Sequence, residues 1–241
     1  MTTTLPPLSP TPRSTVARGH RRAASDRAAL HEVLRESLVC HLGVVVGDGA
    51  EAHPLVVPTA FGWDPDGPDA GGTVYLHGSV AARSLRAAPG ATVCATFTLL
   101  DGLVAARSAF HHSMNHRSAV VLGVPRLVED PAERLRALAL VVDQSVPGRS
   151  ATLRPHTRKE LAATAVLALP LHEASVKTRA GDPVDDEADV ASGTWAGTVP
   201  LRLVAGDPVT AADAAGPPPA DVRARAAGLG AGLGAGLGAA R

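Results

Sequence analysis

Residues 39–61 read VCHLGVVVGDGAEAHPLVVPTAF, two β-rich runs on either side of a turn. The first run, Val39–Val46, is rich in valine, whose branched side chain favours a strand. Asp48-Gly49 is a strong signal for a tight hairpin turn. The second run, Pro54–Phe61, predicts the returning strand. Its two prolines indicate an edge or a bulge, because proline cannot donate to a ladder. The stretch therefore predicts an antiparallel hairpin.

Short strands continue along the chain after this hairpin. The turn-rich segment DPDGPDAGG, residues 64–72, follows directly, and Asp101-Gly102 is expected to break the chain again. Six or seven strands joined mostly by short turns, with helices inserted, predict an α+β barrel rather than a doubly wound parallel sheet. The further strands are expected at Thr73–His77, Ala91–Leu99, Leu103–Phe110, Arg117–Val128 and Thr164–Leu171.

Capping residues mark the expected helices. Ser25 is a candidate N-cap for a helix over residues 26–37, which has an apolar stripe at helical spacing. Asp130 and Pro131 predict a helix to about Asp143, since proline is favoured at the first helical position. Thr157 and Glu160 have the spacing of a capping box before a further short helix.

The composition of the 241 residues excludes several classes of protein. The formal net charge is zero, whereas nucleic-acid binders usually have a basic surplus or stripe. The basic run Arg18–Arg22 is expected to be a solvated terminus. No apolar run reaches the ~20 residues of a membrane span, and the first residues lack the apolar core of a signal peptide. We therefore expect a cytoplasmic protein without membrane or nucleic-acid partners.

The two ends of the chain differ in composition from the middle. Residues 1–15 are rich in Thr and Pro, and residues 206–241 contain GPPPA and a Gly/Ala repeat. Such sequences bury too little apolar surface to offset the entropy of ordering, so both ends are expected to be disordered. One folded domain is expected over residues 16–205. Cys40 and Cys94 lie in apolar runs and predict buried structural thiols rather than a disulfide framework.

The segment YLHGSVAARSLR, residues 75–86, carries the clearest chemistry. It predicts a strand ending at His77, a close backbone approach at Gly78 and a helix from Ser79 to Ala88. A helix start presents unpaired N–H groups and a positive dipole end, which suit an anion. Arg83 lies four residues after Ser79, so the two are expected to share a helix face and hold one phosphate. The alternative is an ordinary strand–turn–helix with a solvated arginine.

Two further segments carry unusual residues. HHSMNHRSAVVLG, residues 111–123, has three histidines, but the spacing does not supply the ligand set of a zinc site, and no metal is expected. Near the C-terminal end, Trp195 is expected either to cover a flat ring or to close the core. Lys177 is one of only two lysines in the chain. No catalytic nucleophile stands out, because no serine lies in a GxSxG elbow and Cys94 lacks the context of a reactive thiol.

Taken in order, eight segments resemble the pyridoxamine 5′-phosphate oxidase-like flavoproteins, in particular the bacterial branch related to nitroimidazole-resistance proteins. The resemblance covers roughly residues 15–203. It implies an FMN-binding split β-barrel and a homodimer with FMN in a cleft between the subunits. The segments are RGHRRAASDRAAL, VCHLGVVV, HPLVVPTAF, VYLHGS, LLDGLVAARSAFHHSMNHRSAVVLG, VPGRS, EASVKTRAGDPVDD and WAGTVPL.

The resemblance also implies the residues that contact the cofactor. The strand–HGS–helix element would approach the ribityl phosphate, the second strand of the hairpin would lie along the ring, and the NxRS element would lie nearby. The chain has His116 where relatives usually have tyrosine. The cofactor-binding set that we expect is Val57, Pro58, Thr59, His77, Gly78, Ser79, Arg83, Asn115, Arg117, Ser118, Lys177 and Trp195.

The expected function is that of an FMN-dependent oxidoreductase or reductase acting on a small molecule, in which the cofactor performs the redox step. Vitamin B6 oxidation is not favoured, because the phosphate-gripping basic pattern of those oxidases is not evident. His77 is the nearest candidate for an acid or base, since imidazole titrates near neutrality. The alternative is a non-catalytic carrier or sensor of flavin, deazaflavin or haem, with His111, His112 or His116 as haem ligands.

Overall fold

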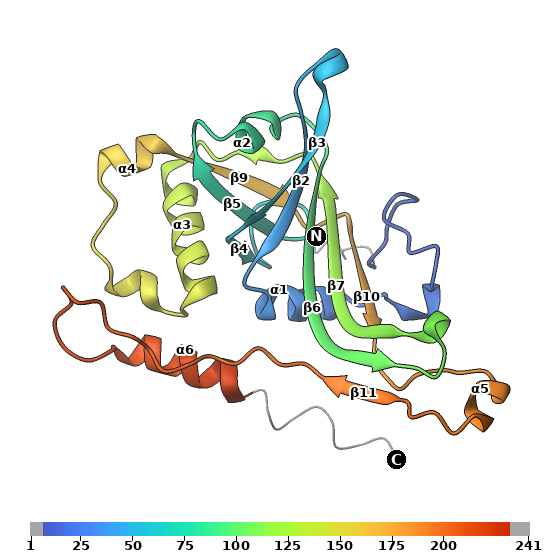
Figure 1. Cartoon of the computed structure of the whole chain (residues 1–241). Helices are drawn as coiled ribbons and strands as arrows, with labels where there is room; N and C mark the ends of the chain where they lie inside the picture. Colours follow the sequence, from blue (N-terminus) through green and yellow to red (C-terminus); the bar gives the residue numbers. More distant parts are fainter. Residues whose placement is uncertain (1–6, 232–241) are drawn as a thin grey trace. The chain divides into compact units, whose positions relative to one another are not determined.

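The structure, a computed structural model, describes residues 7–231 (Figure 1). The described chain divides into two compact units. The first holds residues 7–99, 117–145 and 150–178, and the second holds residues 100–116, 146–149 and 179–231. The fold is α+β, as expected, and its strands form two sheets. Within residues 7–231, no helix is long and apolar enough to cross a membrane.

The larger sheet has seven strands among the described residues. The predicted hairpin is present in it, with β2 and β3 paired antiparallel from Cys40↔Thr59 to Val46↔His53. Gly47 begins the turn with φ +81°, and a Cβ there would lie 2.6 Å from the Glu51 carbonyl oxygen. In order along the sheet, the strands are β1 (Ala23–Ala24), β10 (Ala174–Arg179), β7 (Ser113–Gly123), β6 (Val93–Ala105), β2 (Cys40–Val46) and β3 (His53–Thr59), and β11 (Gly197–Pro200) pairs with β6.

The smaller sheet has four strands among the described residues, in the order β4 (Phe61–Asp64), β5 (Thr73–Ser79), β9 (Thr164–Pro170) and β8 (Arg126–Leu127). Its central strands β5 and β9 carry apolar side chains that are fully buried, including Val74, Leu76, Leu167 and Leu169. Phe61 packs edge-on against Phe97, with ring centroids 4.8 Å apart. Valine, leucine and alanine make up most of the buried cluster, because the chain has few aromatic residues.

The helices begin close to the expected residues where a local cap determines the start. In α1 (Arg27–Glu36) the cap is Asp26, one residue after the expected Ser25. The Asp130 carboxylate accepts a hydrogen bond from the Glu133 amide at 2.7 Å at the start of α3 (Pro131–Ser145). The capping box of Thr157 and Glu160 is confirmed at α4 (Arg158–Ala163). The remaining α-helices of the described chain are α2 (Arg83–Ala87), α5 (Glu187–Ala191) and α6 (Ala220–Ala231).

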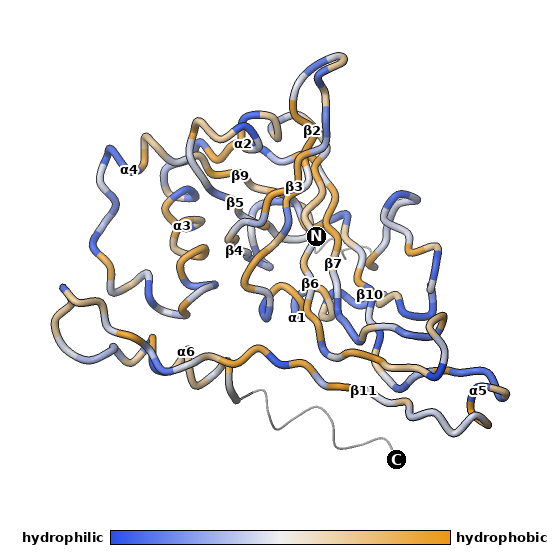
Figure 2. Tube along the Cα trace, viewed as in Figure 1, coloured by the Kyte–Doolittle hydropathy of each residue, from blue (hydrophilic) through white to orange (hydrophobic). Residues whose placement is uncertain are grey.

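Helix α3 packs on β4 at a glycine. A Cβ on Gly62 would lie 2.7 Å from the backbone of Leu140 and Val141, so only glycine permits this approach. The buried side of α3 is formed by Ala137, Leu138 and Val141. Figure 2 shows apolar residues following β6 and β7, in keeping with their place inside the larger sheet.

The expected break at Asp101-Gly102 is wrong, because β6 runs without interruption from Val93 to Ala105. The reason is a tertiary pairing: Gly102 lies opposite Pro200 of β11, and the Asp101 carbonyl accepts a hydrogen bond from the Leu201 amide at 3.0 Å. The two expected strands on either side of the break are therefore one strand. The expected strand over residues 117–128 is also divided, into β7 and β8.

The ends of the described chain carry contacts and secondary structure. Leu8 belongs to the buried core cluster, and the Ser9 amide donates to the Ala174 carbonyl at 2.7 Å. Helix α6 lies within the segment expected to be a disordered tail. The rest of the expected disorder, at residues 1–6 and 232–241, lies outside the described residues. Leu8 and Ser9 therefore contact the folded core, and the expected domain limits stay a prediction.

Candidate functional site

The helix expected at Ser79 begins four residues later. Strand β5 continues through Ser79, which pairs with Thr164 of β9, and α2 starts at Arg83 after Ala82. The Ser79 hydroxyl instead accepts a hydrogen bond from the Ala81 amide at 3.2 Å. Ser79 and Arg83 therefore do not share a helix face, and the expected anion site at a helix start is wrong. The β5–β9 ladder holds these residues extended, although their local sequence suits a helix cap.

His77 and Gly78 lie at the end of β5. A Cβ on Gly78 would meet the Leu85 side chain at 2.8 Å, so this glycine lets α2 pack closely on the strand. Burial lowers the pKa of His77, which favours a neutral imidazole at pH 7. Its Nδ1 atom is buried and has no hydrogen-bond partner among the described residues. A buried polar atom of this kind is suited to a ligand, because leaving it unpaired costs free energy.

Val57, Pro58 and Thr59 lie on β3 at one edge of the larger sheet, as the prolines predicted. Val57 is half-buried against the core, Pro58 is exposed, and the Thr59 hydroxyl donates to the Ala60 carbonyl at 3.1 Å. Pro58 takes an edge position where no ladder donor is needed. At these three residues, strand β3 would contact a ligand through its backbone edge and not through charged side chains.

The residues of the NxRS element have partners within the protein. The Asn115 side chain accepts from Arg179 and donates to the Gly181 carbonyl at 3.1 Å, and Asn115 is buried. Arg117 on β7 forms a two-point ion pair with Glu36, at 2.7 and 2.8 Å. Ser118 donates to the backbone carbonyl of Lys177 at 3.4 Å. These contacts give the element a structural role that the sequence did not reveal.

The three histidines of the second segment differ in surroundings. His112 directs Nδ1 to the Ser108 carbonyl at 2.9 Å, and His116 directs Nδ1 to the Met114 carbonyl at 3.2 Å. His111 Nε2 lies 3.5 Å from an Asp186 carboxylate oxygen. With Asp189, His111 and Asp186 bring three possible ligand atoms within 4.8 Å of one another. The Asp186 side chain is 82% exposed, so this group on its own does not make a metal centre.

Trp195 does not close the core, because it is 68% exposed. Its ring lies over Gly197, where a Cβ would be 2.8 Å from Trp195 Cζ2. An exposed indole held over a glycine presents a flat apolar face to a ligand or partner. Both cysteines are free, and Cys40 is buried as expected, which raises the pKa of its thiol to about 12, whereas Cys94 is only half-buried.

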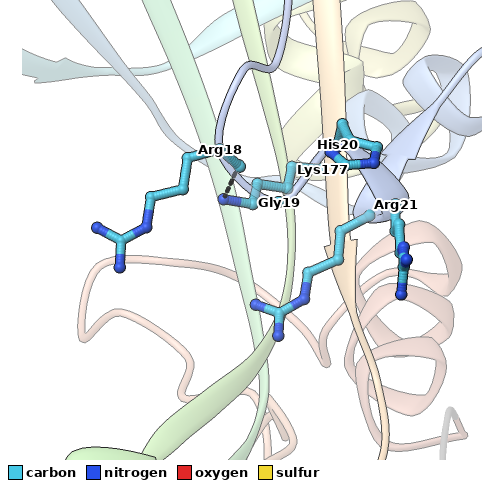
Figure 3. Close-up of a pocket in the computed structure, with 6 residues that line it drawn as sticks. Arg18, Gly19, His20, Arg21 and Lys177 are labelled. Atoms are coloured by element: carbon cyan, nitrogen blue, oxygen red, sulfur yellow. Dashed lines mark hydrogen bonds between the residues drawn. The ribbon is translucent and has the colours of Figure 1, made fainter.

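Lys177 lines a hollow of about 440 Å³ together with the segment Arg18–Arg22 (Figure 3). We call this hollow the basic pocket; its lining residues are Arg18, Gly19, His20, Arg21, Arg22 and Lys177. Lys177 lies opposite Ala23 in the β1–β10 pair, which brings the basic run beside β10. The Lys177 ammonium donates to the Arg18 carbonyl at 3.2 Å. The basic run is exposed, as expected of a solvated segment, and it also lines this hollow.

A local turn of the chain gives the basic pocket its shape. Gly19 has φ +73°, in the left-handed region that favours glycine. The short 3₁₀ turn η1 (His20–Arg22) follows, closed by a hydrogen bond from the Arg22 amide to the Gly19 carbonyl at 2.9 Å. A Cβ on Gly19 would touch the end of the Lys177 side chain at 3.4 Å. The turn therefore brings the backbone of the basic run against Lys177.

Comparison with known proteins places this geometry in a family. Residues 26–178 match the family model described as pyridoxamine 5′-phosphate oxidase. The chain belongs to the pyridoxamine 5′-phosphate oxidase family. It is 37% identical to the flavocytochrome Anf3 from Azotobacter vinelandii, with a TM-score of 0.80, over 90% of this chain and 98% of Anf3. None of the curated proteins searched matches the chain.

Two other solved structures are similar to this chain. The FAD and heme binding protein from Mycobacterium smegmatis is 38% identical, with a TM-score of 0.76, over 85% of this chain and 97% of that protein. The fold is also shared by a protein from Bacteroides thetaiotaomicron that is assigned to 5-nitroimidazole antibiotic resistance. The two chains are 23% identical, with a TM-score of 0.51, over 64% of this chain and 85% of that protein. The expected α+β fold class is thereby confirmed, and its antiparallel sheets are compatible with the expected split barrel.

Proposed function

We propose that this member of the pyridoxamine 5′-phosphate oxidase family binds a flavin nucleotide and uses it in electron or hydride transfer. The observation that carries the proposal is the similarity, over most of both chains, to a flavocytochrome and to an FAD and heme binding protein. A bound flavin would supply the redox chemistry, and the protein would supply binding, orientation and electrostatics.

The residues that we propose at the flavin come from the expected set, without the shared phosphate site of Ser79 and Arg83, and the role of each depends on its contacts. The unpaired Nδ1 of His77 is available to hydrogen-bond a ligand, and the exposed ring of Trp195 is available to cover an apolar surface. Asn115 and Arg117 already bind Arg179 and Glu36, so they would act by positioning their strand. Because burial lowers the pKa of His77, its ring would act as a neutral donor or acceptor near pH 7.

FMN is the cofactor expected from the sequence, and the similarity to the FAD and heme binding protein from Mycobacterium smegmatis favours FAD as a second candidate. The cofactor's identity is therefore part of the test. The full chain would be purified, its visible spectrum recorded, and the released cofactor identified by mass. Two visible flavin bands and a released FMN or FAD are expected. A colourless protein that takes up neither nucleotide would contradict the proposal.

Haem binding is a second candidate, favoured by the orientation of two histidines. His112 and His116 each direct Nδ1 to a backbone carbonyl, which favours the tautomer whose Nε2 is free to ligate a metal. One of these two residues is then the proposed axial ligand. Reconstitution with haem should give a sharp Soret band that is lost in His112→Ala or His116→Ala. His53, which also directs Nδ1 to a carbonyl, provides the matched control His53→Ala. A Soret band unchanged in both test variants would exclude these ligands.

We also propose a homodimer, as the family resemblance implies. Apolar side chains are exposed on the hairpin, including Val45 at 57% and Val56 at 62%. An exposed edge strand such as β3 needs a cover or a partner to avoid uncontrolled pairing. If the flavin contacts both subunits, flavin binding must strengthen the dimer by the same free energy. Sedimentation of flavin-free and flavin-loaded protein across a dilution series tests this, and a monomer that binds flavin equally well would contradict it.

A further inference from the structure

We infer that the basic pocket binds the phosphate groups of a diphosphate-containing ligand. This site is built by Arg18, His20, Arg21 and Arg22 from the N-terminal segment and by Lys177 from β10. Apart from Lys177, the residues of this pocket lie outside the expected flavin set. The inference also goes beyond the segment matched by the family model, which begins at residue 26.

The charges of the pocket have no acidic partners. Within residues 7–231, the side chains of Arg18, Arg21, Arg22 and Lys177 form no ion pair. Seven other arginines of the described chain do pair with carboxylates. Those pairs are Arg13–Glu173, Arg107–Asp185, Arg117–Glu36, Arg126–Glu133, Arg136–Asp64, Arg149–Asp221 and Arg154–Glu160.

Four cations without an acidic partner among the described residues line one hollow, and a bound anion would be attracted to all of them. The backbone places them there in a defined way. The β1–β10 pair and the Lys177–Arg18 hydrogen bond bring the basic run and Lys177 together, and the left-handed Gly19 turns the chain between Arg18 and η1. Solvation of a free terminus does not by itself explain why the basic run lies against Lys177.

The chemistry of the groups indicates a phosphate ligand. A guanidinium binds phosphate oxygens through two parallel hydrogen bonds, and a lysine ammonium serves as a point charge for phosphate. A diphosphate offers more phosphate oxygens to three arginines and a lysine than a single phosphate does, so that more of these donors can bind it. The volume of about 440 Å³ lies in the usual range of small-molecule pockets, roughly 300–1,000 Å³.

An extended polyanion is the less suitable ligand. The formal net charge of the whole chain is zero, and the unpaired cations of the pocket come from one short segment and one strand. Nucleic acids and anionic membranes are recognised by basic stripes or long patches. The diphosphate has two sources, the diphosphate of a flavin dinucleotide and that of a separate nucleotide. Both have the same chemistry, and the experiment below distinguishes them.

The direct test uses inorganic pyrophosphate as the probe and calorimetry on the full-length, flavin-free protein at low salt. Pyrophosphate should bind more tightly than sulfate, and binding should weaken as salt is added. Each of Arg18→Gln, Arg21→Gln and Arg22→Gln should weaken binding by about 10-fold or more, as for a lost charge-assisted hydrogen bond. The matched control is Arg35→Gln, an exposed arginine on α1 that does not line the pocket.

FAD, riboflavin and ADP then identify the source of the diphosphate. If the pocket holds the flavin's own diphosphate, the pocket variants should lose affinity for FAD but keep their affinity for riboflavin. If it holds a separate nucleotide, ADP and pyrophosphate should still bind the flavin-loaded protein. Pyrophosphate that binds no better than sulfate, or that binds all three variants as it binds the control, would overturn the inference. Because pyrophosphate contains no flavin, the pyrophosphate titration would still test the pocket if the protein bound no flavin.

Discussion

Arg13 and Glu173 lie 160 residues apart in the sequence, and the Arg13 guanidinium donates two hydrogen bonds to the Glu173 carboxylate, at 2.8 Å from Nε and 2.6 Å from Nη2. The Thr11 hydroxyl also donates to this carboxylate. Glu173 directly precedes β10, the strand that carries Lys177. The N-terminal segment is therefore attached to the first unit at two places, here and at the basic pocket.

Removal of residues 1–13 should destabilise the protein. The deletion removes Leu8 from the core cluster, and loss of a fully buried leucine side chain alone costs about 1.5–3 kcal/mol. It also leaves Glu173 without Arg13. Urea unfolding should show a lower midpoint with little change in slope. A midpoint equal to that of the full chain would show that the segment is dispensable, as its composition suggested.

The Arg13–Glu173 pair should make stability depend on acid pH. Hydrogen bonds from Arg13 lower the pKa of Glu173 from 4.5 to about 2. A depressed carboxyl pKa stabilises the fold above the unfolded value, and this stabilisation is lost as pH falls from about 4.5 toward 2. Arg13→Gln should therefore be less stable than the parent at pH 7 and should approach it near pH 2. A stability difference that stays constant over this range would exclude the pair as its cause.

Arg126 should matter more to stability than a comparable surface arginine. It binds Asp69 at 2.9 Å and bridges to Glu133, and the side chains of both acids are largely buried, at 12% and 16% exposure. Tyr75 also donates to Glu133 at 3.0 Å. Arg126→Met leaves two carboxylates without a cation and should cost roughly 1.5–3 kcal/mol in the free energy of unfolding.

The control for Arg126 is Arg154→Met, in a pair with Glu160 in which both side chains are exposed. Exposed pairs contribute little because water and salt screen them. Thermal and urea unfolding of both variants should show the larger loss for Arg126→Met. Equal losses would mean that burial of the two acids does not determine the effect.

Trp195 should report on ligand binding through its fluorescence. The chain has two tryptophans, and Trp63 is half-buried whereas Trp195 is 68% exposed. Acrylamide should quench mainly Trp195, and Trp195→Phe should remove most of the quenchable signal. If Trp195 covers the flavin as we propose, adding flavin should protect it from acrylamide. Quenching of Trp195 that is the same with and without bound flavin would place this residue away from the cofactor.

The sequence by itself determined the features that depend on neighbouring residues. The hairpin of β2 and β3 follows from two β-rich runs around a turn signal, although the 3₁₀ turn η2 (Gly49–Glu51) joins the strands in place of a tight Asp48-Gly49 turn. The start of α4 follows from the Thr157–Glu160 capping box. These signals are local because each hydrogen bond or turn joins residues a few positions apart. The ordered set of motifs also identified the family.

Only the tertiary structure decided the features that depend on distant partners. Ser79 stays in a strand because β9 pairs with it, and Asp101-Gly102 stays in a strand because β11 does. The basic run becomes part of a pocket because Arg18 meets Lys177, which lies 159 residues away. A long-range strand pairing outweighs a local cap or turn preference, since it satisfies several buried backbone groups at once.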